Sequence, residues 1–176
     1  MRHAGLAMFV HIVWGTWDRL PLITDIIQPK LYHAIGAECT ALKVEILALG
    51  GVEDHVHVLV SLPATISLAQ LLKQMKGATA HLMTHVVAPD QFFKWQGAYG
   101  AVSVSPDDIP AVCDYIKHQR EHHAQQTLIP AWEPQHPSAP PSRVTTISDT
   151  TRHIPERTGL SSVSAGPIWT EFDGDD

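Results

Sequence analysis

The fold is decided by residues 54–60, DHVHVLV, in which an aliphatic run follows the turn-forming residues 50–54, GGVED. Valine and leucine favour strands and glycine and aspartate interrupt them, so this stretch predicts a short buried strand. Side chains alternate along a strand, which places His55 and His57 on the same face. Two adjacent imidazoles can form half of a divalent-metal site. Their spacing alone fits a pair of solvent-facing histidines rather better, so the metal interpretation depends on residues elsewhere.

Three further strands are predicted around this one. Residues 7–14 are rich in Phe, Val, Ile and Trp, residues 44–49 read VEILAL, and residues 99–104 follow the Trp95-Gln96 segment. Only a short turn separates residues 44–49 from the histidine strand, so these two should pair in antiparallel fashion.

Three helices are predicted between and after the strands. The first covers residues 29–42 and has a proline in its first turn, where proline is tolerated. The second begins at Ser67, a capping residue with a glutamine three positions later. Gly77 is out of place inside that helix and predicts either its end or a close backbone approach. The third runs over residues 106–124, behind the capping Ser105.

The order strand, helix, strand, strand, helix, strand is the split βαβ pattern. We therefore expect an α+β protein with a ferredoxin-like four-stranded antiparallel sheet, helices on one face and an additional C-terminal helix. The histidine strand should be central. Residues 1–133 are expected to form this domain, and residues 134–176, rich in Pro, Ser and Thr, a disordered tail.

Composition restricts the possible partners. The chain has 176 residues and 44% apolar content, enough for one globular domain. Its net charge of −6 counts against nucleic acid at first sight, and residues 1–133 alone hold nine basic and twelve acidic side chains. A polyanion would need a local patch, helped by a metal and by backbone amides. Two cysteines without a CxxC pattern, and no apolar stretch long enough to span a membrane, predict a cytoplasmic protein without a membrane partner.

A second pair of polar residues lies on the last predicted helix. Tyr115 and Gln119 are one turn apart and share a face, while Val112 and Ile116 should anchor a neighbouring face on the domain. A helical tyrosine is by default an amphipathic residue at the edge of a core. Its combination with two strand histidines, Gln119 and the Trp95-Gln96 segment weakens that default interpretation.

Four motifs carry a resemblance to a known family over about the first three-quarters of the chain. They are residues 54–59 (DHVHVL), 72–77 (LKQMKG), 95–105 (WQGAYGAVSVS) and 115–123 (YIKHQREHH). The chain resembles the HUH superfamily of single-strand endonucleases and transposases. It is most similar to the small single-tyrosine, insertion-sequence-200-like transposases, including those associated with repetitive extragenic palindromes.

The resemblance implies a site and a reaction. Tyr115 would be the nucleophile, and His55, His57 and Gln119 would bind Mg²⁺ or Mn²⁺, which polarises the scissile phosphate. The enzyme would cleave and rejoin single-stranded DNA at hairpin-flanked element ends through a 5′-phosphotyrosine. One tyrosine per subunit implies a homodimer, in which the tyrosine helix could complete either its own site or that of the partner. A DNA substrate implies association with the nucleoid.

Several side chains are candidates for DNA contacts. Cations contact the phosphate backbone and aromatic rings stack on unpaired bases. The candidates are Arg19, Lys73, Lys76, Lys94, Trp95, Tyr99, Lys117 and Arg120. Scattered lysines more often form a solvated face, and a tryptophan more often lies in a core.

Two other functions are compatible with parts of the pattern. A domesticated relative could bind DNA hairpins without transposing, although Tyr115 and the three ligand candidates are intact. A histidine-triad nucleotide hydrolase also carries His-x-His in a strand, but that family needs a third histidine where this chain has Leu59.

Overall fold

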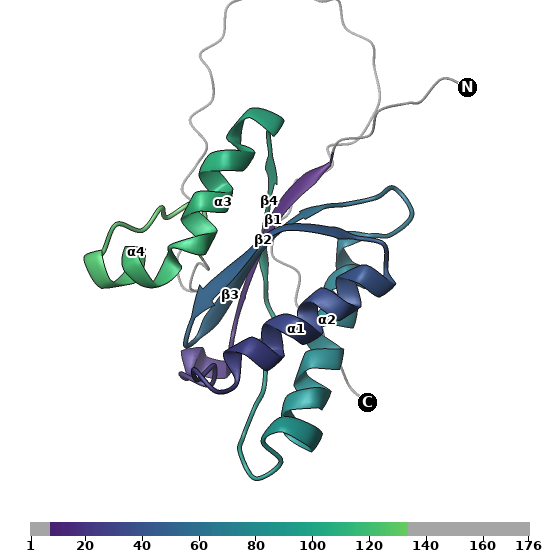
Figure 1. The fold of residues 1–176 in the computed structure, drawn as a ribbon, viewed down its shortest axis with the longest axis vertical. Helices are drawn as coiled ribbons and strands as arrows, with labels where there is room; N and C mark the ends of the chain where they lie inside the picture. Colours follow the sequence, from purple (N-terminus) through teal and green to yellow (C-terminus); the bar gives the residue numbers. More distant parts are fainter. Residues whose placement is uncertain (1–7, 134–176) are drawn as a thin grey trace, which may run out of the picture.

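The strand that carries the two histidines lies inside a four-stranded antiparallel sheet (Figure 1). The computed structural model describes residues 8–133. The strands are β1 (Phe9–Gly15), β2 (Glu45–Val52), β3 (His55–Ser61) and β4 (Gly100–Val104), in the order β2-β3-β1-β4. The predicted ferredoxin-like α+β fold and the central place of the histidine strand are confirmed.

Both faces of β3 are covered. Val56, Val58 and Val60 are fully buried on the face that forms the main core. His55 and His57 alternate with these valines and therefore lie on the opposite face, where both are 0% exposed. The solvent-facing alternative for the histidine pair is therefore wrong.

Helices α1 (Gln28–Ala41) and α2 (Leu68–Leu82) pack on the valine face of the sheet (Figure 1). The predicted cap of α2 is confirmed, because the Ser67 side chain accepts a hydrogen bond from the Gln70 backbone N–H. Both expectations for Gly77 are wrong. It lies in mid-helix, α2 continues into a π-helical turn, η2 (Met83–Val87), and a Cβ at Gly77 would meet no atom within 4 Å.

The third predicted helix is broken. In place of one helix over residues 106–124 the chain forms a 3-10 turn, η3 (Pro106–Asp108), then α3 (Ile109–Lys117) and α4 (Gln119–Gln125). His118 separates the two α-helices with non-helical dihedral angles of φ −104° and ψ 25°. Residues 117–123, KHQREHH, contain no apolar anchor, so core packing does not hold the second helix in line with the first. Ser105 precedes η3 without making a side-chain cap bond.

Helix α3 lies on the histidine face of the sheet, opposite α1 and α2 (Figure 1). Val112 and Ile116 pack there in a second core cluster with Ala48 and Leu59, which confirms them as anchors. The helix backbone comes unusually close to β2, because a Cβ at Gly50 would lie 2.0 Å from the Ile116 carbonyl oxygen. Glycine at this position lets α3 lie directly over the sheet.

Several other expectations concern the chain as a whole. None of the helices within residues 8–133 combines the length and apolar character needed to cross a membrane. Cys39 and Cys113 are free. The predicted disordered tail, residues 134–176, lies outside the described residues.

Candidate active site

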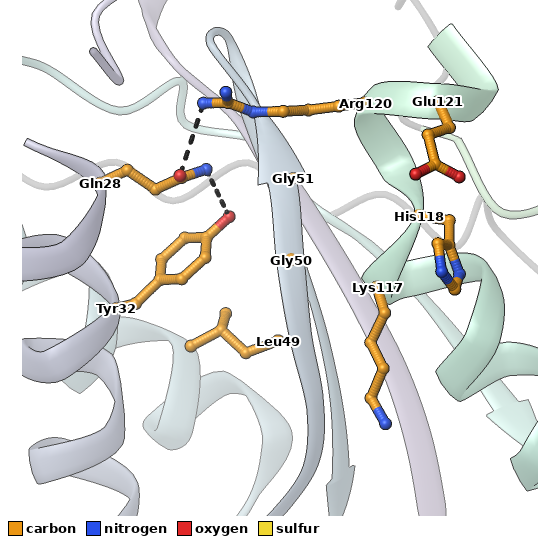
Figure 2. A pocket seen from close by; sticks show the side chains of 9 residues that line it. All are labelled: Gln28, Tyr32, Leu49, Gly50, Gly51, Lys117, His118, Arg120 and Glu121. Atoms are coloured by element: carbon orange, nitrogen blue, oxygen red, sulfur yellow. Dashed lines mark hydrogen bonds between the residues drawn. The ribbon is translucent and has the colours of Figure 1, made fainter. Parts of the chain in front are cut away.

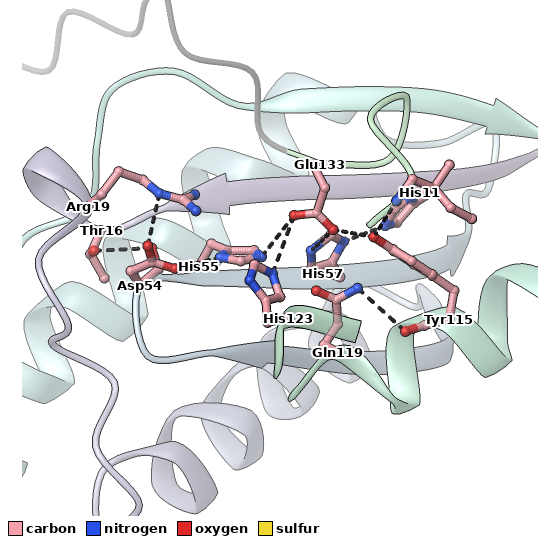
Figure 3. Close-up of polar contacts among 11 residues, drawn as sticks. His11, Thr16, Arg19, Asp54, His55, His57, Tyr115, Gln119, His123 and Glu133 are labelled. Carbon is pink, nitrogen blue, oxygen red and sulfur yellow. Dashed lines mark hydrogen bonds and ion pairs between the residues drawn. The ribbon is translucent and has the colours of Figure 1, made fainter. Parts of the chain in front are cut away.

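The two strand histidines are oriented by neighbours that occupy one nitrogen of each ring (Figure 3). His55 Nδ1 lies 2.6 Å from Asp54 Oδ1. His57 Nδ1 lies 2.9 Å from the Nε2 atom of His11, a buried residue of β1. Such partners fix the ring and its tautomer, so the Nε2 atom of each histidine is left to face the site.

A carboxylate that the sequence did not indicate lies between these Nε2 atoms. Glu133 Oε2 is 3.3 Å from His55 Nε2, and Glu133 Oε1 is 3.8 Å from His57 Nε2. His123, on α4, places its Nε2 atom 3.6 Å from Glu133 Oε2. One ligand atom each from His55, His57 and Glu133 can be chosen so that all lie within 4.8 Å of one another, a grouping that can hold a metal ion.

Four buried atoms around this point have no hydrogen-bond partner among the described residues. They are the Nε2 atoms of His55, His57 and His123 and the Oε1 atom of Gln119. Buried polar atoms are nearly always paired, so four orphaned atoms that can offer lone pairs in one place need an explanation. Imidazole nitrogen together with amide and carboxylate oxygen suits Mn²⁺, and the oxygen ligands also suit Mg²⁺. The residues present therefore fit a divalent cation.

Gln119 reaches the site despite the helix break. Its Nε2 atom donates to the Tyr115 carbonyl oxygen at 3.4 Å, which accounts for one end of the amide. Figure 3 shows the amide group lying between His123 and Tyr115, on the side of the histidines. The sequence therefore predicted correctly that Tyr115 and Gln119 lie together, although they belong to two helices.

Tyr115 points its hydroxyl at the same carboxylate. The hydroxyl donates a very short hydrogen bond to Glu133 Oε1 and accepts one of 3.1 Å from the Ile129 N–H. Its ring centroid lies 6.1 Å from that of His57 in the same chain. Burial, together with the adjacent Glu133 carboxylate, raises the pKa of Tyr115 to about 12. At rest the group is a phenol.

Burial also determines the charge of the surrounding groups. It lowers the pKa of His57 well below its usual value and that of His11 to about 4, so both rings are neutral at neutral pH. Burial opposes ionisation of Glu133 as well, but the nearby His55 ring and the hydrogen bond from Tyr115 outweigh it and lower the Glu133 pKa. Burial opposes protonation of His55 too, but the carboxylates of Asp54 and Glu133 outweigh it and raise the His55 pKa. The site thus combines a neutral His57 with an ionised carboxylate, and a metal would displace the proton that His55 gains.

Trp95 was predicted to stack on unpaired bases, but its side chain is buried and is not available to them. It is 6% exposed, with its ring edge-on to Trp14 and its Nε1 atom bonded to Thr79 Oγ1 at 2.9 Å. A β-bridge between Thr16 and Trp95 ties this segment to the end of β1 and so turns the ring inward. Tyr99 is also buried in the main core.

The predicted phosphate contacts fall into two groups. Three cations are engaged with protein oxygens: Lys76 donates to the carbonyls of Gln96 and Gly97, Arg19 pairs with Asp54, and Arg120 with Asp25. Burial lowers the pKa of Lys76 to about 8, so it serves chiefly to hold the loop. Lys73, Lys94 and Lys117 are exposed.

Lys117 and Arg120 line a hollow beside β2 (Figure 2). Its volume is about 290 Å³. Gln28 bridges across it, with Nε2 donating to the Tyr32 hydroxyl at 3.1 Å and Oε1 lying 3.4 Å from Arg120 Nη2. None of the residues that line it is a candidate metal ligand.

Three residues of the site were missed by sequence reasoning. His123 had a usable signal, because it lies one turn after Gln119 on the same helix face. His11 had a weaker one, as its position in β1 is paired with Leu59, two residues from His57. Glu133 had none. It is brought back by a chain that leaves α4 through Gln126 in the left-handed conformation, and its neighbour Trp132 packs edge-on against Tyr115.

The comparisons with known proteins agree with this geometry. The family model described as Transposase IS200 like matches residues 6–119, and the chain belongs to this family of transposases. No curated protein matches the chain.

Two solved structures share the fold. The first, a protein from Deinococcus radiodurans R1 described as a transposase, has a TM-score of 0.53 at 24% identity, over 68% of this chain and 95% of that chain. The second, a REP-associated tyrosine transposase bound to a REP hairpin, has a TM-score of 0.53 at 16% identity, over 76% of this chain and 74% of that chain. At these identities the likeness concerns the fold.

Proposed function

We propose that this transposase cleaves and rejoins single-stranded DNA at hairpin-flanked element ends, with Tyr115 as the nucleophile. One observation carries the proposal: the Tyr115 hydroxyl is bonded to the carboxylate that also lies 3.3 Å and 3.8 Å from the Nε2 atoms of His55 and His57. A nucleophile and a set of metal ligands thus meet at one carboxylate. The hairpin carried by the similar REP-associated transposase supports a DNA hairpin as partner.

The cation would be held by His55, His57, Gln119 and Glu133 through the atoms described above. Mg²⁺ or Mn²⁺ would supply Lewis-acid polarisation of the scissile phosphate. Asp54 and His11 hold the two imidazoles in the orientation that leaves their Nε2 atoms free.

The remaining steps belong to residues of the chain. The Tyr115 oxygen attacks phosphorus, an O–P bond forms, and the P–O3′ bond breaks. Glu133 is positioned to take the phenolic proton, and the leaving 3′ oxygen takes one up to become a 3′-OH. Because the pKa of Tyr115 is raised and that of Glu133 is lowered, the proton moves only as attack proceeds, which is general-base catalysis. Attack by another 3′-OH on the phosphotyrosine reverses the step and joins strands.

The proposal includes a homodimer. Each chain offers one tyrosine at its site, whereas excising an element requires two cleavages. Tyr115 lies beside His57 of its own chain, so each subunit would cleave with its own tyrosine. Sedimentation equilibrium should give a dimer, and a monomer at all concentrations would contradict this part of the proposal.

A second function is favoured by the closed state of the site. Tyr115 is 3% exposed and its hydroxyl is already bonded, so the protein could bind DNA hairpins without cutting them. In that case the histidines would be structural.

An assay for covalent adducts distinguishes the two functions. We expect a panel of labelled single-stranded hairpin oligonucleotides to give a denaturation-resistant protein–DNA adduct with Mn²⁺ or Mg²⁺. The adduct should disappear in chelator and in Tyr115→Phe, and persist in Tyr32→Phe, which changes a tyrosine outside the site. Hairpin binding without any adduct would favour the second function, and a preference for duplex DNA would contradict both.

A further inference from the structure

The turn after β1 holds a strained backbone. In η1 (Trp17–Arg19), Asp18 has φ 51° and ψ 28°, and Arg19 has φ 55°. Two successive non-glycine residues in the left-handed region are unfavourable and persist only where the surrounding contacts require them. Strain of this kind concentrates at ligand sites, so the purpose of the turn needs an explanation.

Several contacts fix the turn to the segments around it. The Thr16 N–H donates to the Asp54 carbonyl oxygen at 2.9 Å, and the Thr16 hydroxyl donates to the Leu20 carbonyl oxygen at 2.6 Å. Arg19 Nε lies 3.0 Å from Asp54 Oδ2, and the Trp17 N–H donates to the Lys94 carbonyl oxygen at 2.9 Å. The turn is therefore held at both ends.

The aromatic side chain that this turn presents outward is Trp17, next to the exposed Asp18. Trp17 is 44% exposed, whereas Trp14 and Trp95 are 0% and 6% exposed. Lys94 places its Nζ atom 3.9 Å from the centroid of the Trp17 ring. An exposed indole beside an ammonium group is the combination that single-strand binders use, because the ring stacks on a base and the cation pairs with phosphate.

The turn is joined directly to the candidate active site. Asp54 bonds Arg19 through Oδ2 and His55 Nδ1 through Oδ1, so one carboxylate links the turn to a candidate metal ligand. Gly15, two residues before Trp17, is the β-sheet partner of His55. Figure 3 shows Arg19, Asp54 and His55 in a row that leads to Glu133.

We propose that Trp17 is the stacking platform for one unpaired base of the DNA strand as it leaves the active site, with Lys94 pairing with an adjacent phosphate. The inference rests on the proposed function and names the contact that positions the strand. It also explains how a chain of net charge −6 could hold DNA here, since Lys94 brings an exposed cation to an exposed aromatic ring. Trp17 thus takes the role that Trp95 cannot perform.

The test measures single-strand binding without cleavage. The measurements are made in chelator, on protein that also carries Tyr115→Phe. Trp17→Leu should raise the Kd for a hairpin oligonucleotide by roughly 5- to 150-fold, the range for one base–aromatic stack. Trp17→Phe keeps a ring and should restore part of the affinity. The matched control is Phe92→Leu, which changes an exposed aromatic that has no cation over its ring within residues 8–133, and it should leave the Kd unchanged.

The stacked base can be located by combining each variant with abasic sites. At one nucleotide, removal of the base should weaken binding by the parent protein as much as Trp17→Leu does. The variant and the abasic site together should weaken binding no more than either change alone. Additive losses at every nucleotide, or an unchanged Kd for Trp17→Leu while the parent protein binds, would overturn the inference and leave the proposed function standing. Failure of the parent protein to bind any single strand would overturn both.

Discussion

Glu133 connects Tyr115, the proposed nucleophile, to the candidate metal ligands. Its carboxylate accepts a hydrogen bond from the Tyr115 hydroxyl and lies within 3.8 Å of the Nε2 atoms of His55 and His57. Its lowered pKa keeps it ionised at neutral pH. An anion at this point both offsets the charge of a bound cation and accepts a proton, so its replacement should affect metal binding directly.

We expect Glu133→Gln to weaken Mn²⁺ binding by at least about tenfold, because the amide keeps the shape and loses the charge of a ligand. Isothermal titration calorimetry on the protein without DNA measures this. Glu121→Gln changes an exposed glutamate of α4 and should bind Mn²⁺ as wild type does. Equal affinity in Glu133→Gln and wild type would remove Glu133 from the ligand set.

At the scale of elements, two glycines that look alike in the sequence have opposite structural meaning. Gly50 lies under α3, and a Cβ there would meet the Ile116 carbonyl oxygen at 2.0 Å. Gly77 lies in mid-helix with open space where its Cβ would be. The first permits the contact that places Tyr115 over β3, and the second contributes only backbone freedom.

Gly50→Ala should therefore destabilise the protein by about 1–3 kcal/mol through overpacking, and should reduce adduct formation because α3 is displaced. Gly77→Ala should stabilise it by about 0.5–1 kcal/mol, since alanine loses less entropy in a helix. Denaturant unfolding measures both changes. Similar effects from the two substitutions would contradict the close contact between α3 and β2.

The elements also show what the sequence could and could not predict. The alternation in residues 54–60 and the Ser67 cap are local signals, and the strand and the helix start they predicted are present. The absence of an apolar anchor in residues 117–123 permits the break at His118 but does not predict it, because the residues on both sides are compatible with one continuous helix. The second helix departs where Gln119 is buried beside the histidines, a tertiary contact that no local pattern reports.

The same distinction applies to the site. His55, His57, Tyr115 and Gln119 lie together as the family motifs implied, because each motif sits on an element whose place follows from the fold. Glu133 arrives from an irregular segment, so only the folded chain reveals it. Trp95 was misassigned because the sequence does not show whether an aromatic side chain just before a strand points into the core or toward solvent.

For the whole molecule, charge sets a limit on DNA binding. Net charge is −6, and Arg19, Lys76 and Arg120 are engaged with protein oxygens. The candidates left exposed and free for phosphate are Lys73, Lys94 and Lys117. Few phosphate contacts mean that salt should weaken binding only modestly.

With about 0.7 counterions released per single-strand phosphate contact, the plot of log K against log salt should have a slope of about −2. Fluorescence anisotropy between about 50 and 200 mM salt measures it, and Lys117→Gln should make the slope shallower by about 0.7. Asp25→Asn frees Arg120 and should steepen it. A slope of about −4 in wild type would show that the engaged cations also turn toward DNA.

The hairpin between β2 and β3 makes the chain unevenly tolerant of insertions. Val52 pairs with His55, so the turn consists of Glu53 and Asp54 alone. One extra residue at the start of β3 would exchange its faces, sending both imidazoles into the helix-covered core and turning the valines toward Tyr115. The connection between Leu62 and Ser67 is not a strand, so an added residue there does not exchange the two faces of β3. This connection can change length without moving a site residue. We therefore expect insertions to be tolerated in this loop, whereas β3 should tolerate only substitutions.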